Sequence, residues 1–309
     1  MRKFKAILAC LLFSFPVAAV VGIDNDDLTT TVETSKEFSS VKMRWIPAGT
    51  FEMGSSISVE DIQNQYGFDF TEAAKGGWAD QLPRHERIIS SGFWMAETEV
   101  TLLAFKAFVS ATGYVTEAEE DGKAFGRGED GFGEYPGLTW RQPGWSQSDD
   151  QPVTVISWED ANAYIQWLNQ SSGNGFHLPT EVEWEYAARA GTESNFYWGD
   201  STAAAGEYAN VLDAYWGDEF SDRFDTTAPV GSYKSNDWRL YDMVGNVWEW
   251  TSSDYTADYT VPLEPAENGG KVDRGGGWDS PPYNARIANR GAASGTFAST
   301  NLGFRLVHD

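Results

Sequence analysis

Large aromatic side chains and glycines are both abundant in this chain, and together they constrain its fold more than any other feature of the sequence. The 309 residues include 14 Trp, 13 Tyr, 18 Phe and 31 Gly. The aromatics supply large apolar surfaces for a core, and the glycines permit tight turns. Hydrophobic residues make up 41% of the chain, which argues against wholesale disorder and against a fibrous protein. We therefore expect a core wrapped by irregular, tightly turning backbone.

The charge balance is strongly acidic. The chain carries 22 Lys and Arg against 46 Asp and Glu, a formal net charge of −24 at pH 7. Such a field repels a phosphate backbone, so nucleic acid is not an expected partner. Cations are the more natural ligands, although solubility alone also explains an acidic surface.

The amino terminus is typical of a secretory signal peptide. Arg2, Lys3 and Lys5 form a positive region, residues 6–15 form a short apolar region, and residues 17–19 provide small side chains for cleavage. The apolar run is too short for a transmembrane helix. We expect cleavage near residue 19 and a secreted or periplasmic protein, with no membrane span.

The only cysteine of the chain lies inside this predicted signal. Cys10 follows a stretch that resembles a lipoprotein cleavage box, but almost no apolar segment precedes it, which favours ordinary export. The mature chain then has no thiol, and this excludes disulfides, thiolate metal sites and cysteine nucleophiles. His85, His177 and His308 are the only imidazoles, and they show no metal-ligand spacing.

The mature chain is expected to form one domain. Residues 20–40 are rich in Thr, Ser, Asp and Glu and predict a flexible lead-in, and residues 41–309 predict a single globular domain that opens with a strand at 41–47. Residues 56–80 are interpreted as a surface insertion. Residues 122–145 are rich in glycine and aromatics and predict a long ordered loop.

Three helices are indicated by capping residues followed by apolar side chains at helical spacing. Two of them also carry an acidic residue at the capping-box position, namely Asp160 and Glu183. The expected N-caps are Thr101, Ser157 and Thr180, and the expected ends lie at Gly113, before Gly173 and at Gly191. Short strands are expected between and beyond these helices.

Six motifs occur in an order that resembles one known family. They occupy residues 46–54, 152–161, 178–189, 245–250, 274–278 and 301–305. On these motifs the chain resembles the formylglycine-generating enzyme (sulfatase-modifying factor) superfamily over nearly all of residues 41–309. The resemblance implies an α+β, C-type-lectin-like fold with little regular secondary structure, in agreement with the composition.

The resemblance breaks at the reactive centre. Formylglycine-generating enzymes oxidise a sulfatase cysteine with copper(I), held by two cysteines of their own. Here Ser280 stands at the first cysteine position, Asn284 or Ala285 lies near the second, and Gly277 replaces the motif serine. Copper(I) needs soft thiolate ligands, so the chain is not predicted to perform that chemistry. Relatives without these cysteines include a periplasmic branch that matures the pyoverdine chromophore, and others serve as lipoproteins, receptors or partner proteins.

The resemblance also implies one or two calcium ions. Calcium prefers six to eight hard oxygen ligands, which carboxylates and turn carbonyls supply. The first implied site comprises Asn210, the Val211 carbonyl, Asp222 and the Phe224 carbonyl. The second comprises Asp242, the Gly245 and Val247 carbonyls and Glu249. The alternative is that these residues form turns and caps without a metal. The sequence assigns no redox metal.

The remaining candidate residues follow from their position in the family pattern. The predicted catalytic residues are Asp279, Ser280 and Tyr283, and the predicted substrate-binding residues are Trp248, Trp250, Arg286 and Asn301. Alternating tryptophans also suit a core strand. Arginines in so acidic a chain also suit internal pairing with carboxylates, an alternative that applies to Arg274, Arg286, Arg290 and Arg305.

Two functions are consistent with these features. The first is an exported atypical oxidoreductase or maturation factor that acts on a small molecule or peptide. The second is a non-catalytic, lectin-like module that binds a peptide, a glycan or a partner protein. Turnover of a bound ligand distinguishes the two.

Overall fold

The computed structural model describes residues 35–38, 40–66, 79–128, 131–173, 175–212, 223–257, 259, 270–281 and 283–309. These residues belong to one compact unit, Glu33–Asp309. The predicted signal peptide and most of the predicted lead-in lie outside the described residues.

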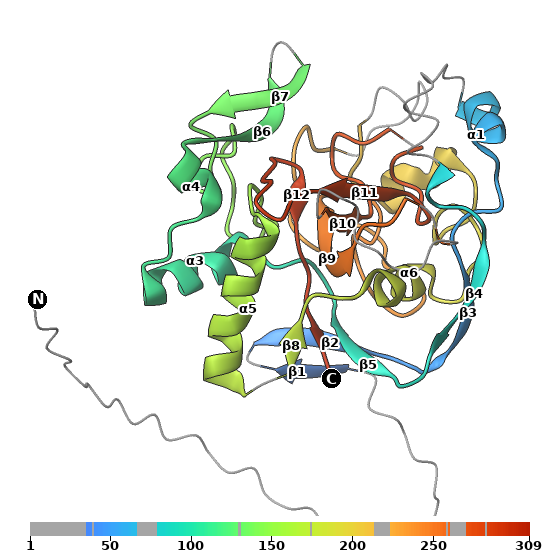
Figure 1. The fold of residues 1–309 in the computed structure, drawn as a ribbon, viewed down its shortest axis with the longest axis horizontal. Helices are drawn as coiled ribbons and strands as arrows, with labels where there is room; N and C mark the ends of the chain where they lie inside the picture. The colour runs from blue at the N-terminus through green and yellow to red at the C-terminus, as the bar shows by residue number, and fades with distance from the viewer. Residues whose placement is uncertain are drawn as a thin grey trace, which may run out of the picture. The chain divides into compact units, whose positions relative to one another are not determined.

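A five-stranded antiparallel sheet joins the beginning of the domain to its end (Figure 1). Its order is β1 (Ser35–Phe38), β2 (Val41–Ile46), β5 (Phe93–Ala96), β13 (Val307–His308) and β8 (Phe176–His177). The strand predicted at 41–47 is confirmed as β2. The predicted lead-in is shorter than expected, because β1 pairs with β2 through residues 35–38.

A four-stranded sheet brings three of the sequence motifs together (Figure 1). Its order is β11 (Arg290–Ala293), β10 (Lys271–Arg274), β9 (Trp248–Asp254) and β12 (Leu302–Gly303). Strand β9 is antiparallel to β10 and parallel to β12. The motifs around residues 245–250, 274–278 and 301–305 therefore meet in space, although more than 50 residues separate the first from the last.

Two smaller antiparallel sheets, of two strands each, complete the described strands. One pairs β3 (Gly49–Met53) with β4 (His85–Ile89), and the other pairs β6 (Lys123–Gly128) with β7 (Gly131–Pro136). The β6–β7 pair is a hairpin, and it corrects the expectation of a long loop at 122–145. It is held against the chain before β12, because the Phe125 amide donates to the Ala298 carbonyl and the Thr300 amide donates to the Phe125 carbonyl.

The three predicted helices are confirmed as α3 (Leu102–Thr112), α5 (Trp158–Ser172) and α6 (Glu181–Arg189). Each begins after its predicted N-cap, and the α5 and α6 capping boxes are both complete. One end differs from the prediction: α6 is capped by Ala190 in the left-handed region at φ 45°, one residue before Gly191. The other helical segments are α1 (Val59–Tyr66), α4 (Glu117–Asp121) and the 3-10 turn η1 (Thr202–Glu207).

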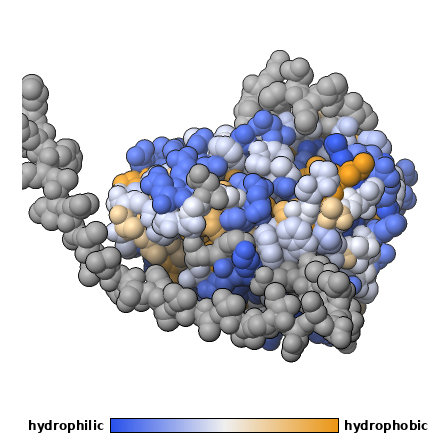
Figure 2. All heavy atoms as spheres, turned by 90° about the horizontal axis from the view of Figure 1, so that it is seen from below, coloured by the Kyte–Doolittle hydropathy of each residue, from blue (hydrophilic) through white to orange (hydrophobic). Residues whose placement is uncertain are grey.

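Aromatic side chains fill two cores, as the composition predicts. The first lies around α3 and α5 and includes Phe105, Tyr164 and Phe304, and the second lies around α6 and includes Trp184 and Phe196. On the face shown in Figure 2, hydrophilic side chains predominate and hydrophobic ones form only small separate patches. This surface agrees with the acidic composition.

Candidate functional site

The position of the missing first cysteine lies in a tight turn directly after β10. The Ser280 hydroxyl oxygen accepts a hydrogen bond from the Gly277 amide at 2.9 Å, and the Ser280 amide donates to the Gly277 carbonyl. Ser280 is only 2% exposed. The turn therefore uses the serine as an internal hydrogen-bond acceptor, which does not suit an accessible nucleophile.

Two predicted site residues from distant motifs come together beside this turn. The Asn301 side-chain amide donates to both carboxylate oxygens of Asp279, at 2.9 and 3.2 Å. The Ser299 hydroxyl donates to the Asn301 oxygen at 2.7 Å and so fixes which end of the amide faces Asp279. Burial raises the pKa of Asp279, and the Asn301 hydrogen bond opposes that rise. Asp279 is thus a positioned carboxyl group that can accept or donate a proton.

A groove of about 460 Å³ adjoins this pair on the edge of the four-stranded sheet. Trp248 and Asn301, both predicted to bind substrate, contribute to its lining. The other lining residues are Phe132, Asp273, Gly291, Ala292, Ala293, Ser294, Phe297 and Leu302. The walls are therefore largely apolar and aromatic, with a few polar groups, which is the usual make-up of a small-molecule or peptide site.

Trp250 does not reach this groove, contrary to the prediction. It is fully buried in the first core, and its indole nitrogen donates to the Ile156 carbonyl at 2.9 Å. Trp248 and Trp250 are two residues apart on β9 and therefore point to the same face of the strand. Because β9 runs into the core, Trp250 is buried and only Trp248 remains half-buried. The alternative interpretation of a core strand is correct for Trp250.

Arg286 is also an internal residue rather than a substrate contact. It is fully buried, its guanidinium donates to Gln81 Oε1 at 2.7 Å, and its Nε donates to the Tyr283 carbonyl. Tyr283, a predicted catalytic residue, is half-buried and contributes this carbonyl to the same turn region.

The expected internal pairing of arginines is confirmed for the other three. Arg274 pairs with Glu185 and Glu181, Arg290 with Glu181, and Arg305 with Glu249. All of these side chains are buried.

The residues of the first implied calcium site fit a hard cation where the structure describes them. The Asn210 side-chain nitrogen donates to the Thr226 carbonyl at 2.8 Å and to Asn246 Oδ1 at 3.1 Å. These bonds engage the side-chain nitrogen, and the buried Asn210 Oδ1 has no hydrogen-bond donor among the described residues. Val211 is buried beside it. Asp222 lies outside the described residues, and Phe224 lies within them.

The second implied calcium site fits less well. Both oxygens of the Glu249 carboxylate are engaged: Arg305 donates to them at 2.5 and 2.6 Å, and the Trp184 indole donates at 2.7 Å. A guanidinium at this distance repels a cation. Asp242 accepts a hydrogen bond from the Gly231 amide at 2.6 Å. The backbone of Gly245 and Asn246, which lie between Asp242 and Glu249 in sequence, is left-handed, with φ of 81° and 61°. Glu249 therefore serves the fold rather than a metal.

Sequence reasoning missed Glu99, a buried carboxylate beside Asp242. The Asn246 amide donates to Glu99 Oε1 at 2.8 Å, but Glu99 Oε2 has no donor among the described residues. Burial raises the pKa of Glu99 well above its usual value, and the Asp242 charge raises it further while Arg305 lowers it. No motif distinguishes Glu99 from a surface acid, so its burial could not be predicted.

His85 and His177 are partly exposed and make local contacts within the fold. His85 contacts the Pro83 carbonyl and accepts from Arg87, and His177 contacts the Leu178 carbonyl. Within the described ranges, no group of three or more His, Cys, Asp and Glu side chains could hold a metal ion.

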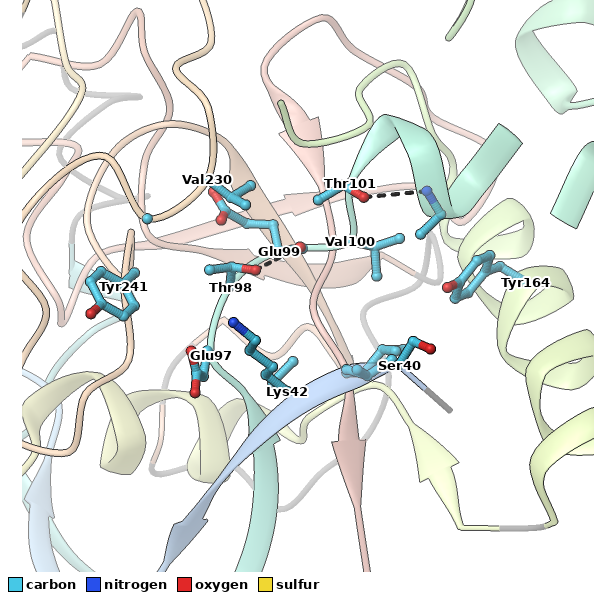
Figure 3. Close-up of a pocket in the computed structure, with 15 residues that line it drawn as sticks. Ser40, Lys42, Glu97, Thr98, Glu99, Val100, Thr101, Tyr164, Val230 and Tyr241 are labelled. Carbon is cyan, nitrogen blue, oxygen red and sulfur yellow. Dashed lines mark hydrogen bonds between the residues drawn. The ribbon is translucent and has the colours of Figure 1, made fainter. Parts of the chain in front are cut away.

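A second cavity, of about 430 Å³, lies between the five-stranded sheet and α5 (Figure 3). Figure 3 shows Lys42 and Glu97 on one side and Tyr164 on the other. Glu99 lines its inner wall, but none of the residues predicted for catalysis or substrate binding does. The groove beside Asp279 is therefore the candidate site that the fold and the sequence both indicate.

The fold and the cysteine-free turn define a class of protein: a formylglycine-generating-enzyme-like domain without the copper-binding thiolates. Comparison with family models agrees. The model described as "Sulfatase-modifying factor enzyme 1-like domain" matches residues 29–309, and the chain belongs to this family.

Relatives with different names share this similarity. The chain is 33% identical over 306 residues to "Formylglycine-generating enzyme" from Mus musculus, covering 87% of this chain and 75% of the relative. It is 34% identical over 238 residues to "Inactive C-alpha-formylglycine-generating enzyme 2" from Mus musculus, covering 67% and 72%. Among solved structures, PvdO from Pseudomonas aeruginosa matches with a TM-score of 0.70 and 26% identity, covering 89% of this chain and 98% of that one.

The helices of the described residues are short. No helix among them combines the length and the apolar character that crossing a bilayer requires.

Proposed function

We propose that this protein is a maturation factor that holds a small molecule or a peptide in the groove beside Trp248 and Asn301 and acts on it without copper(I). The observation that supports this most is the Asp279–Asn301 pair, a positioned and half-buried carboxyl group at the place where the family has its reactive centre. Similarity to PvdO over nearly the full length of both chains, and the pyoverdine-maturation branch that the sequence resembles, support the same proposal.

The proposed chemistry follows from the groups at the centre. A serine that is 2% exposed and bonded to Gly277 does not serve as a nucleophile. Asp279 can move a proton, and Tyr283 is a half-buried phenol nearby in sequence. We propose that Asp279 acts as the acid–base group and Tyr283 assists it. Any oxidation would use dioxygen as the electron acceptor.

A second proposal is a binding module without turnover. The same burial of Ser280 favours it, and a family relative is named inactive. The groove would then hold a peptide, a glycan or a partner protein. Either function is proposed to operate outside the cytoplasm, because residues 1–19 have the layout of a signal peptide.

Turnover separates the two proposals. The mature protein is incubated with a panel of phenol- and thiol-containing small molecules and peptides, while oxygen uptake and product mass are followed. We expect conversion of at least one compound, with a loss of about 10²-fold in Asp279→Asn, the usual size of an acid–base contribution. Tyr135→Phe, a hydrogen-bonded phenol on the β6–β7 hairpin, is the matched control for Tyr283→Phe. Saturable binding without any conversion would establish the binding module instead.

We also propose calcium at the first implied site, where Asn210 Oδ1 and the Val211 carbonyl would contribute ligands together with Asp222 and Phe224. The buried Asn210 Oδ1, which no hydrogen-bond donor among the described residues contacts, supports this. Calcium would hold together segments that have no regular hydrogen-bond ladder, so its expected role is structural.

Calcium removal is expected to lower the melting temperature by about 5–10 °C. An ion held at 100 times its dissociation constant stabilises the folded state by about 2.7 kcal/mol, and a protein of this size shifts by about 2–4 °C per kcal/mol. Differential scanning calorimetry with EDTA and with added calcium checks this. Asn210→Ala should abolish the calcium response, whereas Asn162→Ala, which removes a helix-surface amide, should retain it. An unchanged response in Asn210→Ala would contradict the assignment.

A further inference from the structure

The groove contains a charged group that neither the motifs nor the proposed chemistry uses. Asp273 lies in the middle of β10 and lines the groove. Among the described residues, the lining includes no Lys, Arg or His, and Asp273 is the one ionisable side chain that it contains. Asp273 is only 8% exposed.

Strand alternation explains why Asp273 faces the groove. Successive side chains of a strand point to opposite faces of the sheet. Arg274 points to the α6 side, where its guanidinium bonds to Glu185 and to the Ile287 carbonyl. Asp273 therefore points to the other face, where its neighbours across the sheet are Trp250 on β9 and Gly291 on β11.

The chain keeps space for this carboxylate. A Cβ atom added to Gly291 would lie 2.1 Å from Asp273 Oδ1, so no other residue fits opposite Asp273 without displacing it. No hydrogen-bond donor or cation among the described residues contacts the Asp273 carboxylate within bonding distance. Burial raises the pKa of Asp273 to about 7, and the Glu181 charge raises it while Arg274 lowers it. An ionised Asp273 carboxylate therefore has no charge or hydrogen-bond partner among the described residues, and a bound ligand could supply one.

The walls around Asp273 suit an organic cation. Phe132 and Phe297 lie on the groove, and each packs on Phe125 of the β6–β7 hairpin, with ring centroids 6.1 and 4.8 Å apart. Trp248 adds a third aromatic ring. Aromatic faces attract cations, and a carboxylate forms strong charge-assisted hydrogen bonds with ammonium and guanidinium groups. The net charge of −24 favours the approach of such a ligand.

We propose that Asp273 and the aromatic rings of the groove form a subsite for an ammonium or guanidinium group carried by the ligand. This inference rests on the proposed function in one respect, because it assigns a chemical class to the ligand of the same groove. It applies equally to a converted substrate and to a ligand that is only bound. The cationic group could belong to a free amine or to a Lys or Arg side chain of a peptide.

Binding of defined probes tests this subsite without any need for turnover. The full mature protein is titrated calorimetrically at pH 8 with n-butylammonium, n-butylguanidinium and neutral n-butanol. Nα-acetyl-lysine N-methylamide and its neutral norleucine counterpart represent a peptide side chain. We expect each cation to bind about tenfold more tightly than its neutral counterpart, the effect of one charge-assisted hydrogen bond. Tighter binding of the lysine probe than of n-butylammonium would indicate a peptide ligand, and the reverse a free amine.

Matched variants assign the effect to one carboxylate. Asp273→Asn keeps the shape of the side chain and should abolish the preference for cations. Asp254→Asn removes an exposed carboxylate, paired with Lys271, from the neighbouring strand and should retain it. Near-ultraviolet circular dichroism verifies that both variants are folded. Equal binding of cations and neutral probes, or an unchanged preference in Asp273→Asn, would overturn the proposal. A failed turnover assay would leave this result unaffected, so the two proposals fail separately.

Discussion

Replacement of Glu185 by glutamine is expected to destabilise the protein by about 3–5 kcal/mol, the usual cost of breaking a buried ion pair from one side. Glu185 is fully buried on α6. Its carboxylate accepts from the Gly54 amide at 2.8 Å, from Arg189 Nε at 2.9 Å and from Arg274. The variant leaves two buried guanidinium groups without their shared carboxylate, and this uncompensated charge causes the loss.

The pH dependence of that loss is also predicted. Burial opposes ionisation of Glu185, but Arg189 and Arg274 outweigh it and lower the pKa below the ordinary value of 4.5. A depressed carboxyl pKa contributes stability above the unfolded-state value, and this contribution disappears as the pH falls through the folded-state value. Urea unfolding at several pH values measures the difference between Glu185→Gln and the parent, which should be largest near neutral pH and shrink in acid.

A surface pair supplies the control for Glu185. Glu207 forms an exposed pair with Lys234, so Glu207→Gln should cost less than about 1 kcal/mol at any pH. A similar, small loss in both variants would show that the α6 network does not support the fold.

Replacement of Asp273 by asparagine is expected to stabilise the ligand-free protein at pH 8, by as much as about 4 kcal/mol. Burial raises the pKa of Asp273 from 3.8 to about 7. Between these values the folded state holds a proton that the unfolded state has released, so the stability of the parent protein falls as the pH rises through this window. Each pKa unit corresponds to about 1.4 kcal/mol. The asparagine variant does not titrate and escapes this loss.

The same unfolding experiment checks this prediction. The advantage of Asp273→Asn should be absent near pH 4, grow up to about pH 7 and then remain constant. Asp254→Asn, which changes an exposed carboxylate on β9, should show no such rise. If the advantage of Asp273→Asn were independent of pH, the burial of an ionised carboxylate would not be its cause.

The helical parts of the fold were predictable because their signals are local. Ser157 and Asp160, three residues apart, form the capping box that begins α5, and both halves of that box are visible in the sequence. The β6–β7 hairpin was not predicted, because glycines replace the β-branched residues that usually mark a strand. Its pairing is supported instead by Phe125, which bonds to residues 298 and 300 far along the chain.

The candidate site was only partly predictable, because the burial of each side chain and the direction in which it points depend on tertiary contacts. Motif position correctly placed Asp279 and Asn301 together. The sequence could not show that Trp250 points into the core or that Glu249 forms an ion pair with Arg305. Asp273 was missed for the same reason: a shift of one residue along β10 would exchange its place with that of its neighbour.

The most direct test of this account is a copper(I) competition titration of the mature protein, followed by mass spectrometry of a cysteine-containing sulfatase peptide incubated with the loaded protein and oxygen. The account predicts that residues 20–309, which contain no cysteine, will lose copper(I) to a chelator such as bicinchoninate and leave the peptide cysteine unoxidised. One tightly held copper(I) ion per chain, together with conversion of the cysteine to an aldehyde, would contradict it.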